Sequence, residues 1–285
     1  MKEIVVISGK GGTGKTTLVA SFASLSSNTI ICDCDVDAAN LFLILVPEVE
    51  KEEEFSGQKI AFIDEDKCTE CNICEEYCRF DAIDNSRIKD IKCEGCGVCE
   101  FVCPTGAISL KNVVTGRIIT ANTKYGQFFY GHLYPGAGTS GKMVTEIRKK
   151  ASALSEKNDS DLILIDGSPG IGCPVIASIT GADKALIVTE PTLSGEHDLE
   201  RVIKLTRHFN VRTSVCINKF DINPEITERI ERRCKNEDII IAGKIPYDRV
   251  VTKAMIEAKP VVDFIDNEVT NEIKKIWDIL LNQEK

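Results

Sequence analysis

Eight of the 13 cysteines lie between residues 68 and 103, in two runs that share one spacing. Each run reads C-x2-C-x2-C-x3-C, and the stretches CTECNICEEYCRFDAI and CEGCGVCEFVCPTGAI match position by position with a period of 25 residues. Such clustering in a chain with no secretory signal indicates metal binding rather than disulfides. Thiolates at these intervals are typical ligands of [4Fe–4S] clusters, so the repeat predicts two clusters in a small pseudo-symmetric domain.

The spacing is similar to that of bacterial ferredoxins with two clusters. Three closely spaced thiolates bind three irons of one cube, and the tight turn keeps the fourth away, so that the fourth cysteine of each run ligates the other cluster. A zinc site normally pairs two C-x2-C elements across a longer gap, which makes zinc the weaker alternative. We therefore expect one cluster on Cys68, Cys71, Cys74 and Cys103, and the other on Cys93, Cys96, Cys99 and Cys78.

One position departs from the ferredoxin pattern. Pro104 follows Cys103 as in that family, whereas Arg79 follows Cys78. A cation beside a cluster favours the reduced, more negative form, so the cluster that Cys78 ligates would have the higher potential if Arg79 lay against it. An arginine that points into water would have no such effect, and the sequence leaves both alternatives open.

A second group of residues has the spacing of a phosphate-binding loop. Residues 9–16, GKGGTGKT, fit G-x-x-x-x-G-K-[ST] and lie between an expected strand and an expected helix. Glycines let backbone N–H groups turn toward phosphate oxygens, and the helix N-terminus adds positive potential. We expect Lys15 to reach the β- and γ-phosphates and the Thr16 hydroxyl to ligate Mg²⁺. The residues expected to bind the nucleotide here are Gly9, Lys10, Gly11, Gly12, Thr13, Gly14, Lys15, Thr16 and Thr17.

Lys10 directly follows the first glycine, and through it the sequence resembles the MinD/ParA-type P-loop ATPases, whose loop reads KGGxGKT. In that family this lysine reaches across a nucleotide-sandwich dimer to the partner's phosphates, much as an arginine finger does. The resemblance therefore implies catalytic roles for Lys10 and Lys15. It also implies a nucleotide-dependent dimer, either of identical chains or with a paralogue.

Three further stretches carry this resemblance. DCDVDAANL (residues 33–41) and DGSPGIG (166–172) resemble the two switch segments of the family, and GKIPYD (243–248) resembles its loop beside the base. Asp33 and Asp37 are interpreted as loop caps. The roles that the resemblance implies are orientation of the attacking water by Asp35, a Mg²⁺-bound water on Asp166, an amide to the γ-phosphate from Gly170, and contact with the base by Pro246.

The identity of the base rests on NKFD, residues 218–221. This stretch fits the N-K-x-D pattern by which GTPases read guanine through the aspartate, here Asp221. In the resembled family an asparagine of this segment, here Asn218, contacts adenine instead. We expect ATP, with GTP as the alternative.

The elements that must position these residues alternate between strands and helices. Apolar runs predict strands at residues 3–8, 29–33, 161–166, 184–190, 212–218 and 238–246, with RIITA and GQFFYG as shorter ones, and helices at 15–26, 143–156, 197–209 and about 267–283. This order predicts an α/β fold, a doubly wound and mostly parallel sheet of the P-loop type, with an inserted small α+β ferredoxin-like domain. The expected division is 1–58 and 112–285 for the ATPase domain and 59–111 for the insert.

Composition excludes several classes of partner. The 285 residues carry a net charge of −9 with a pI near 5.1, which argues against tight binding to nucleic acid. No run is long enough to span a membrane, and no leader is expected, so we expect a cytoplasmic protein that binds neither nucleic acid nor membrane. The acidic stretch EVEKEEE is interpreted as a solvated surface, with a basic partner as the alternative.

A phosphate loop and a ferredoxin unit in one chain resemble the MinD-superfamily ATPases with an inserted ferredoxin domain. We expect ATP binding and hydrolysis to gate electron transfer from the clusters to a redox partner. The alternatives are an iron–sulfur carrier of the Mrp type, which donates clusters to an acceptor protein, and a nucleotide-dependent positioning switch with structural clusters. Two complete sets of four cysteines favour retained clusters, and hence electron transfer.

Five cysteines lie outside the repeat, and most are expected to be small core residues. Cys173 lies seven residues after Asp166, the offset at which the nitrogenase iron protein places a cysteine of its dimer-bridging cluster. A small buried residue at a helix start is the favoured interpretation, and a shared metal at a dimer axis is the alternative. The five are Cys32, Cys34, Cys173, Cys216 and Cys234.

Overall fold

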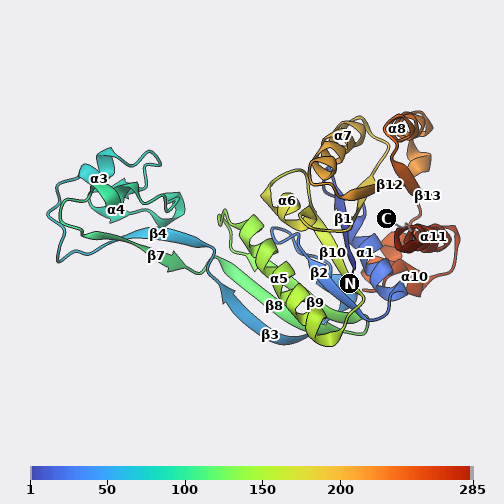
Figure 1. Ribbon diagram of the computed structural model, residues 1–285, viewed down its shortest axis with the longest axis horizontal. Coiled ribbons are helices and arrows are strands. Elements are labelled where there is room, and N and C mark those ends of the chain that lie inside the picture. The colour runs from blue at the N-terminus through green and yellow to red at the C-terminus, as the bar shows by residue number, and fades with distance from the viewer. Residues whose placement is uncertain (1, 283–285) are drawn as a thin grey trace. The chain divides into compact units, whose positions relative to one another are not determined.

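Figure 1 shows the computed structural model, which describes residues 2–282. The chain divides into two compact units, each with its own internal contacts. The nucleotide unit contains Met1–Glu52, Ile118–His132 and Ser140–Lys285, and the cysteine unit contains Glu53–Arg117 and Leu133–Thr139. Residues 59–111, the expected insert, fall inside the cysteine unit.

The main sheet has nine strands in the order β13-β12-β11-β1-β10-β2-β9-β8-β3. From β13 to β9 every pairing is parallel, which confirms the expectation of a mostly parallel α/β sheet. The strands are β1 (Lys2–Ser8), β2 (Thr29–Asp33), β3 (Glu48–Phe55), β8 (Gly116–Thr123), β9 (Gly126–Leu133), β10 (Leu162–Pro169), β11 (Lys184–Thr189), β12 (Arg212–Asn218) and β13 (Ile240–Ile245).

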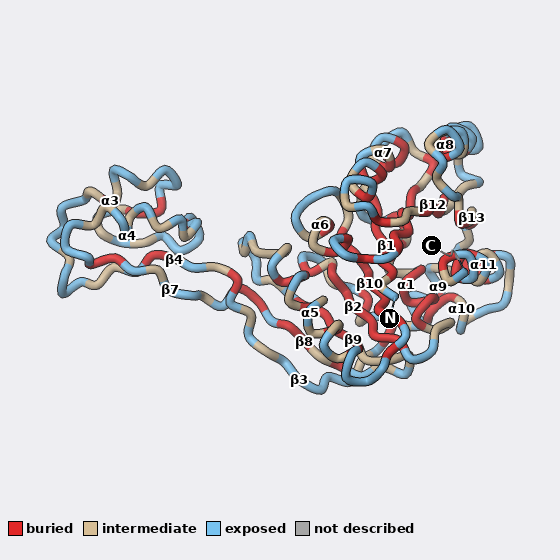
Figure 2. The backbone as a smooth tube through the Cα atoms, in the orientation of Figure 1, coloured by how far each residue is buried: buried red, intermediate tan, exposed pale blue. Residues whose placement is uncertain are grey.

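Helices cover both faces of this sheet. Buried residues of α1, α9, α10 and α11 form one core with alternate strand residues such as Ile4 and Val6, while Val5 and Ile7 between them are equally buried. Burial on both faces explains why the central strands read as continuous apolar runs, and Figure 2 shows β1 and β10 as largely buried. The helices are α1 (Lys15–Leu25), α2 (Phe42–Leu45), α5 (Ser140–Asn158), α6 (Cys173–Ile179), α7 (Leu193–His208), α8 (Pro224–Asn236), α9 (Val250–Ile256), α10 (Val261–Phe264) and α11 (Glu268–Asn282).

The last helix packs onto the sheet, as its apolar face predicts. Trp277 of α11 stacks on Phe22 of α1 with ring centroids 4.9 Å apart, and Ile276 lies directly against Gly243 of β13. Residue 283, the expected end of this helix, lies outside the described residues. Within residues 2–282, no helix has the length and apolar character that a membrane crossing requires.

The acidic stretch is exposed, and it also forms a strand. EVEKEEE forms most of β3, the edge of the nine-stranded sheet, and its residues are mostly exposed. Glutamate and lysine have little preference for strands, so pairing within the sheet, rather than local propensity, gives this segment its conformation.

The cysteine unit is small and carries the repeat in its backbone. Strands β4 (Gln58–Ile63) and β7 (Ile108–Val113) pair antiparallel, β5 (Ile83–Asp84) pairs with β6 (Arg87–Ile88), and the helices are α3 (Ile73–Glu76) and α4 (Val98–Val102). Positive φ angles recur at equivalent positions of the two copies: Glu70 and Gly95, Asn72 and Gly97, Asp81 and Gly106. The second copy has glycine at each of these positions, whereas the first does not.

Candidate functional site

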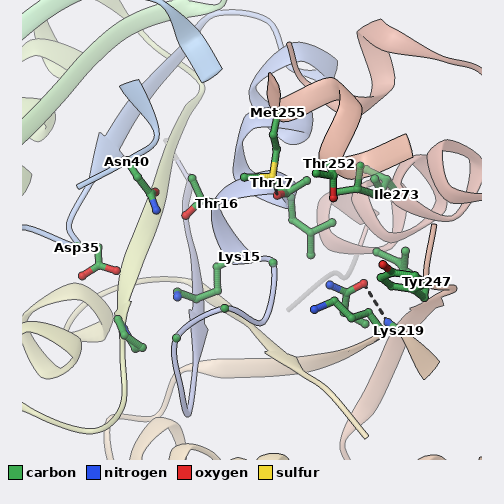
Figure 3. A pocket seen from close by; sticks show the side chains of 18 of the residues that line it. Lys15, Thr16, Thr17, Asp35, Asn40, Lys219, Tyr247, Thr252, Met255 and Ile273 are labelled. Carbon is green, nitrogen blue, oxygen red and sulfur yellow. Dashed lines mark hydrogen bonds between the residues drawn. The ribbon is translucent and has the colours of Figure 1, made fainter. Parts of the chain in front are cut away.

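A cavity of about 630 Å³ lies at the carboxyl ends of the central parallel strands of the nucleotide unit. Small-molecule sites are typically about 300–1,000 Å³ and, in open α/β sheets, lie at this edge where the strand order reverses. In this sheet β10 and β2 lie on one side of β1, and β11 lies on its other side. Figure 3 shows Lys15, Thr16 and Asp35 toward one end of the cavity and Tyr247, Thr252 and Ile273 toward the other.

The loop from β1 to α1 forms one wall of this cavity. Gly14 has a φ of 96°, and a Cβ atom there would lie 2.5 Å from Nδ2 of Asn218, so only glycine fits. Lys15 begins α1 and is only 6% exposed, although it lines the cavity. The expected loop residues on the cavity wall are Gly11, Gly12, Gly14, Lys15, Thr16 and Thr17, whereas Gly9, Lys10 and Thr13 are not among the lining residues.

Two aspartates face each other across neighbouring strands. Asp33 at the end of β2 pairs in register with Asp166 in β10. Asp33 accepts hydrogen bonds from the N–H groups of Asp35 (3.0 Å), Asn40 (3.1 Å) and Leu41 (3.1 Å), which confirms it as the cap of this loop. Burial raises its pKa to about 6, and these N–H groups partly offset that effect.

Asp166 is fully buried, and among residues 2–282 no group makes a hydrogen bond of normal geometry to either oxygen of its carboxyl group, although the Thr16 hydroxyl lies close enough to lower its pKa. Its pKa is raised to about 8, because burial and the charge of Asp33 raise it by more than the charge of Lys15 and the Thr16 hydroxyl lower it. A buried carboxylate without partners is costly unless a cation compensates it. These residues therefore fit a Mg²⁺ ion, because hard cations prefer oxygen ligands and the Thr16 hydroxyl lies on the adjoining wall.

Asp35 lines the cavity together with Lys15. Burial raises the pKa of Asp35, Lys15 lowers it, and Asp37 raises it again. A carboxylate whose pKa is shifted upward, within a cleft and near a cation, has the character of a general base or a water-orienting group.

Lys10 is held within its own chain. Its Nζ lies 3.4 Å from Oε2 of Glu190 and donates to Oγ1 of Thr192 (3.1 Å) and Oγ of Ser194 (3.4 Å). Lys219 also donates to Glu190. The sequence interpretation missed Glu190, although its place directly after β11, at the carboxyl edge of the sheet, is a usable signal.

Gly170, in the segment of residues 166–172, is also hydrogen-bonded within the chain. The Gly170 N–H donates to the Ser8 carbonyl at 2.8 Å, and Gly170 has a φ of 95°. The amide that the family resemblance assigns to the γ-phosphate is therefore bound to the end of β1 in this conformation. A contact with phosphate would require this turn to move.

The far end of the cavity is mostly apolar. Asn218 and Pro246 line it, and Asn218 Nδ2 donates to the Thr13 carbonyl at 2.8 Å. Asp221 is exposed, is not among the lining residues and accepts a hydrogen bond from the Tyr247 N–H at 2.7 Å. Five further lining residues were missed by the interpretation of the sequence, because α9 and α11 are far along the chain from the phosphate loop and are brought to the cavity by folding. They are Val251, Thr252, Met255, Val269 and Ile273.

In the cysteine unit the eight repeat cysteines line two separate cavities. The Cys68 cavity is lined by Cys68, Cys71, Cys74 and Cys103, and the Cys93 cavity by Cys78, Cys93, Cys96 and Cys99. The fold thus brings together the two sets of four that the ferredoxin spacing implies. All 13 cysteines are free thiols in the structure, so the disulfide alternative does not describe it.

Several thiols of these cavities accept backbone hydrogen bonds. The N–H of Ala107 donates to Cys103 Sγ (3.3 Å), that of Ala61 to Cys93 (3.4 Å) and that of Glu70 to Cys68 (3.5 Å). Desolvation raises the pKa of Cys103, but hydrogen bonds from the Thr105 side chain and from backbone amides outweigh it, so that this pKa is lowered. Such bonds favour the thiolate, which is the form that binds metal.

Across residues 2–282, no three His, Cys, Asp or Glu side chains are grouped closely enough to hold one metal ion. The ligands of a single tetrahedral zinc ion lie within about 3.8 Å of one another, given zinc–sulfur bonds of about 2.3 Å. The four thiolates around a cube each bind a different iron and have a wider spacing. Each of the two cavities has a volume of about 20 Å³, and cluster binding by their thiols stays a prediction.

Cys173 corrects one expectation. It begins α6, as the sequence predicts, but it is exposed rather than buried, so its interpretation as a small core residue is wrong. Its Cβ lies 3.1 Å from where a Cβ on Gly141 would be. The other four cysteines outside the repeat, Cys32, Cys34, Cys216 and Cys234, are buried as expected.

The fold and the loop before α1 define a P-loop nucleotide-binding protein. Residues 4–261 match the family model of the CobQ/CobB/MinD/ParA nucleotide binding domain, and the chain belongs to this family of MinD/ParA-type ATPases. The uncharacterized protein MJ0578 of Methanocaldococcus jannaschii is 34% identical over 98% of this chain and 96% of its own length. The septum site-determining protein MinD of Synechocystis is 26% identical over 91% of this chain and 81% of its own.

Solved structures share the fold. The cell division ATPase MinD of Pyrococcus furiosus superposes with a TM-score of 0.61 at 18% identity and covers 99% of both chains. MinD of Pyrococcus horikoshii, complexed with Mg-ADP, gives a TM-score of 0.60 at 18% identity, with 99% of this chain and 96% of that chain covered. At these identities the likeness concerns the fold alone.

Proposed function

We propose that this chain is an ATPase whose ATP binding and hydrolysis are coupled to two [4Fe–4S] clusters in the cysteine unit, and that it gates electron transfer to a redox partner. The observation that carries the proposal is the presence, in one chain, of a family phosphate loop and of two cavities with four thiols each. The two features lie in different units of the chain, and their presence in one polypeptide favours coupled use.

The residues around the cavity of the nucleotide unit support ATP with Mg²⁺. Lys15 would bind the β- and γ-phosphates, and Thr16 and the unpartnered Asp166 would hold the ion directly or through water. Mg²⁺, when bound, neutralises charge that develops on the phosphates. Asp221 is already bound to the Tyr247 backbone and is not on the cavity wall, which favours adenine over guanine. The Mg-ADP complex of the Pyrococcus horikoshii relative agrees with this choice.

For hydrolysis, Asp35 would orient the attacking water, because it lines the cavity together with Lys15. Lys10 would act on the nucleotide of a second copy or of a paralogue, which requires it to leave Glu190 and Thr192. Release of Gly170 from Ser8 would accompany that change. The nucleotide-bound state would therefore differ from the present one at four defined contacts, those of Lys10 with Glu190, Thr192 and Ser194 and that of Gly170 with Ser8.

The cysteine unit supports cluster binding by eight ligands. Cys68, Cys71, Cys74 and Cys103 would hold one cluster, and Cys93, Cys96, Cys99 and Cys78 the other. Each cluster, when bound, can take up one electron. Two complete sets of ligands favour clusters that stay in place, as electron transfer requires, over clusters that are donated.

The covalent path between the two activities is short. The loop that Asp33 caps is followed by α2 and β3, and β3 leads into the cysteine unit at Glu53. A γ-phosphate that reorders residues 33–41 would therefore act on the segment that enters the cluster-binding unit.

The test uses the full chain purified under strict exclusion of oxygen. We expect about eight irons and eight labile sulfides per chain, slow ATP hydrolysis, and cluster spectra that change reversibly when ATP and Mg²⁺ are added. ATP-dependent movement of iron to an added apo-ferredoxin would instead support the carrier alternative. A chain without iron, or clusters that ignore nucleotide, would contradict the proposed coupling.

A further inference from the structure

The two cysteine cavities are related by the repeat but differ at one equivalent position. Two residues after the last cysteine of each run stand Phe80 and Thr105. Phe80 lines the Cys93 cavity, and Thr105 lines the Cys68 cavity. The repeat therefore places an aromatic ring beside one set of thiols and a hydroxyl beside the other.

The remaining linings differ in the same direction. Beside its thiols, the Cys68 cavity is lined by polar side chains (Thr69, Asn72, Ser86 and Thr105) and by apolar ones (Ile63, Pro104, Ala107 and Ile108). The Cys93 cavity is lined mainly by apolar side chains (Ala61, Phe80, Ala82, Ile83, Val98 and Leu110), and its one polar side chain besides the thiols is the carboxylate of Glu94, which accepts but does not donate hydrogen bonds. A charge that is added to a cluster is thus surrounded by more dipoles at the Cys68 cavity.

Hydrogen bonds to sulfur follow this difference. In the part of the chain that the structure describes, the Cys68 set accepts from the N–H groups of Glu70 and Ala107, and Cys103 Sγ lies 3.6 Å from Oγ1 of Thr105. A metal-bound thiolate has no proton, so the Thr105 hydroxyl must be the donor. For the Cys93 set, the N–H of Ala61 donates to Cys93 and the N–H of Glu100 acts on Cys99, and no side-chain hydroxyl lines that cavity within the described residues.

Donors near the ligand sulfurs stabilise the reduced cluster, because reduction adds a negative charge that they solvate. Arg79, which could have favoured the cluster of Cys78, is not among the lining residues of either cavity. It is exposed, as are Thr69, Asn72 and Thr105. The balance of dipoles therefore favours the Cys68 cavity.

We propose that the two clusters have unequal reduction potentials, with the higher at the Cys68 cavity, and that Thr105 and Phe80 set much of this difference. The inference rests on the proposed function, since it needs both clusters. A chain that has taken up one electron holds it mainly at the Cys68 cavity. The redox partner that accepts this electron then has to approach that cavity rather than the other.

An anaerobic redox titration of the full chain with dithionite, followed by electron paramagnetic resonance, tests the inference. We expect two resolved one-electron steps in the wild type. Thr105→Val should lower only the upper step, so that the ratio of reduced to oxidised cluster at the wild-type midpoint falls about three- to tenfold, where tenfold corresponds to 59 mV. Phe80→Thr should raise only the lower step by a comparable factor.

Two variants serve as matched controls. Thr105→Ser keeps the hydroxyl and should restore the upper step. Phe101→Thr removes an aromatic ring that is 91% exposed and is not among the lining residues of either cavity, and it should leave both steps unchanged.

The outcomes separate this inference from the proposal on which it rests. A chain with about eight irons whose clusters titrate together, or whose lower step moves in Thr105→Val, overturns the inference and leaves the bound clusters intact. A chain that binds no iron under strict anaerobic conditions overturns both. Iron and sulfide analysis of every variant is therefore the first measurement.

Discussion

The two units of this chain use their cysteines in opposite ways. In the nucleotide unit four cysteines are buried in a large apolar core, and the candidate site lies at one edge of it. In the cysteine unit the core consists of Ala61, Cys74, Ala82, Ile83, Cys93 and Ile108, so two expected ligands belong to the core itself. We therefore expect the first unit to fold without its ligand, and the second to depend on the proposed clusters for much of its stability.

Removal of iron should produce the largest difference between the two units. Chelation of the anaerobic protein should lower the free energy of unfolding of the cysteine unit by several kcal/mol and unfold it, because its small core includes two expected ligands. The affinity for ATP should change less than about twofold, because the nucleotide unit has a core of its own. Limited proteolysis with nucleotide binding on the same sample measures both effects.

Two variants serve as positive and negative controls for the chelation experiment. Cys74→Ser, which alters a buried expected ligand, should reproduce the effect of chelation, whereas Cys173→Ser, at an exposed cysteine of the nucleotide unit, should leave iron per chain unchanged. Loss of iron from Cys173→Ser would instead revive the hypothesis of a shared metal at that residue. Protease resistance that survives chelation would show that the cysteine unit folds unaided.

Replacement of the loop lysine should produce the converse pattern. Lys15→Ala should lower the rate of phosphate release by about 10²–10³-fold, since it removes a preorganised charge from the phosphate site. Iron content and the optical spectrum should remain those of the wild type. A variant that hydrolysed ATP at the normal rate would remove Lys15 from the mechanism, and one that lost iron would mean that the units do not fold separately.

We expect the free energy of unfolding of the nucleotide unit to depend on pH. Asp166 has a folded pKa of about 8 against an ordinary value of 3.8, so its contribution to stability is fully present below pH 4 and is lost as pH rises through 8. In EDTA, the free energy of unfolding of this unit should fall by up to about 1.4 kcal/mol per pH unit between these limits. Denaturant titrations measure the slope.

Asp166→Asn supplies the control for that slope. It should flatten the curve in EDTA, and Mg²⁺ with nucleotide should flatten it in the wild type, because the ion binds the charged carboxylate. An unchanged slope in Asp166→Asn would assign the pH dependence to another group, such as Asp33.

The smallest effect is expected within the repeat. Glu70 has a φ of 56°, and its equivalent in the second copy is Gly95. Glu70→Gly should stabilise the iron-loaded cysteine unit by about 1 kcal/mol or less, since glycine adopts this conformation without strain but loses more chain entropy. Thermal unfolding measures the change, and Glu65→Gly, outside the residues of positive φ, should destabilise instead.

Much of this architecture could be predicted from the sequence, because local patterns determine it. Apolar runs predicted the central strands, and the loop of residues 9–16 lies between β1 and α1 as expected. The strand β3 could not be predicted, because its five glutamates have little preference for strands, and contacts with distant segments stabilise it: pairing with β8 and a hydrogen bond from Gln127 of β9 to Glu50.

The parts of the site that were missed depend on long-range packing. Met255 and Ile273 reach the cavity from α9 and α11, far along the chain from the loop that they face. The exposure of Cys173 depends on how α6 lies, which no local pattern reports. In contrast, three thiols of each set follow from short spacings, and the resemblance to two-cluster ferredoxins supplied the fourth from the other run, so the sets could be grouped from the sequence.

The contact of Lys10 with Glu190 has a consequence for how copies of this chain would associate. Glu190 binds both Lys10 and Lys219, so a partner's phosphates would have to exchange one anion for another at Lys10 rather than gain a new ion pair. An exchange of this kind changes the free energy little in either direction. A complex of two copies would then be short-lived and would dissociate readily.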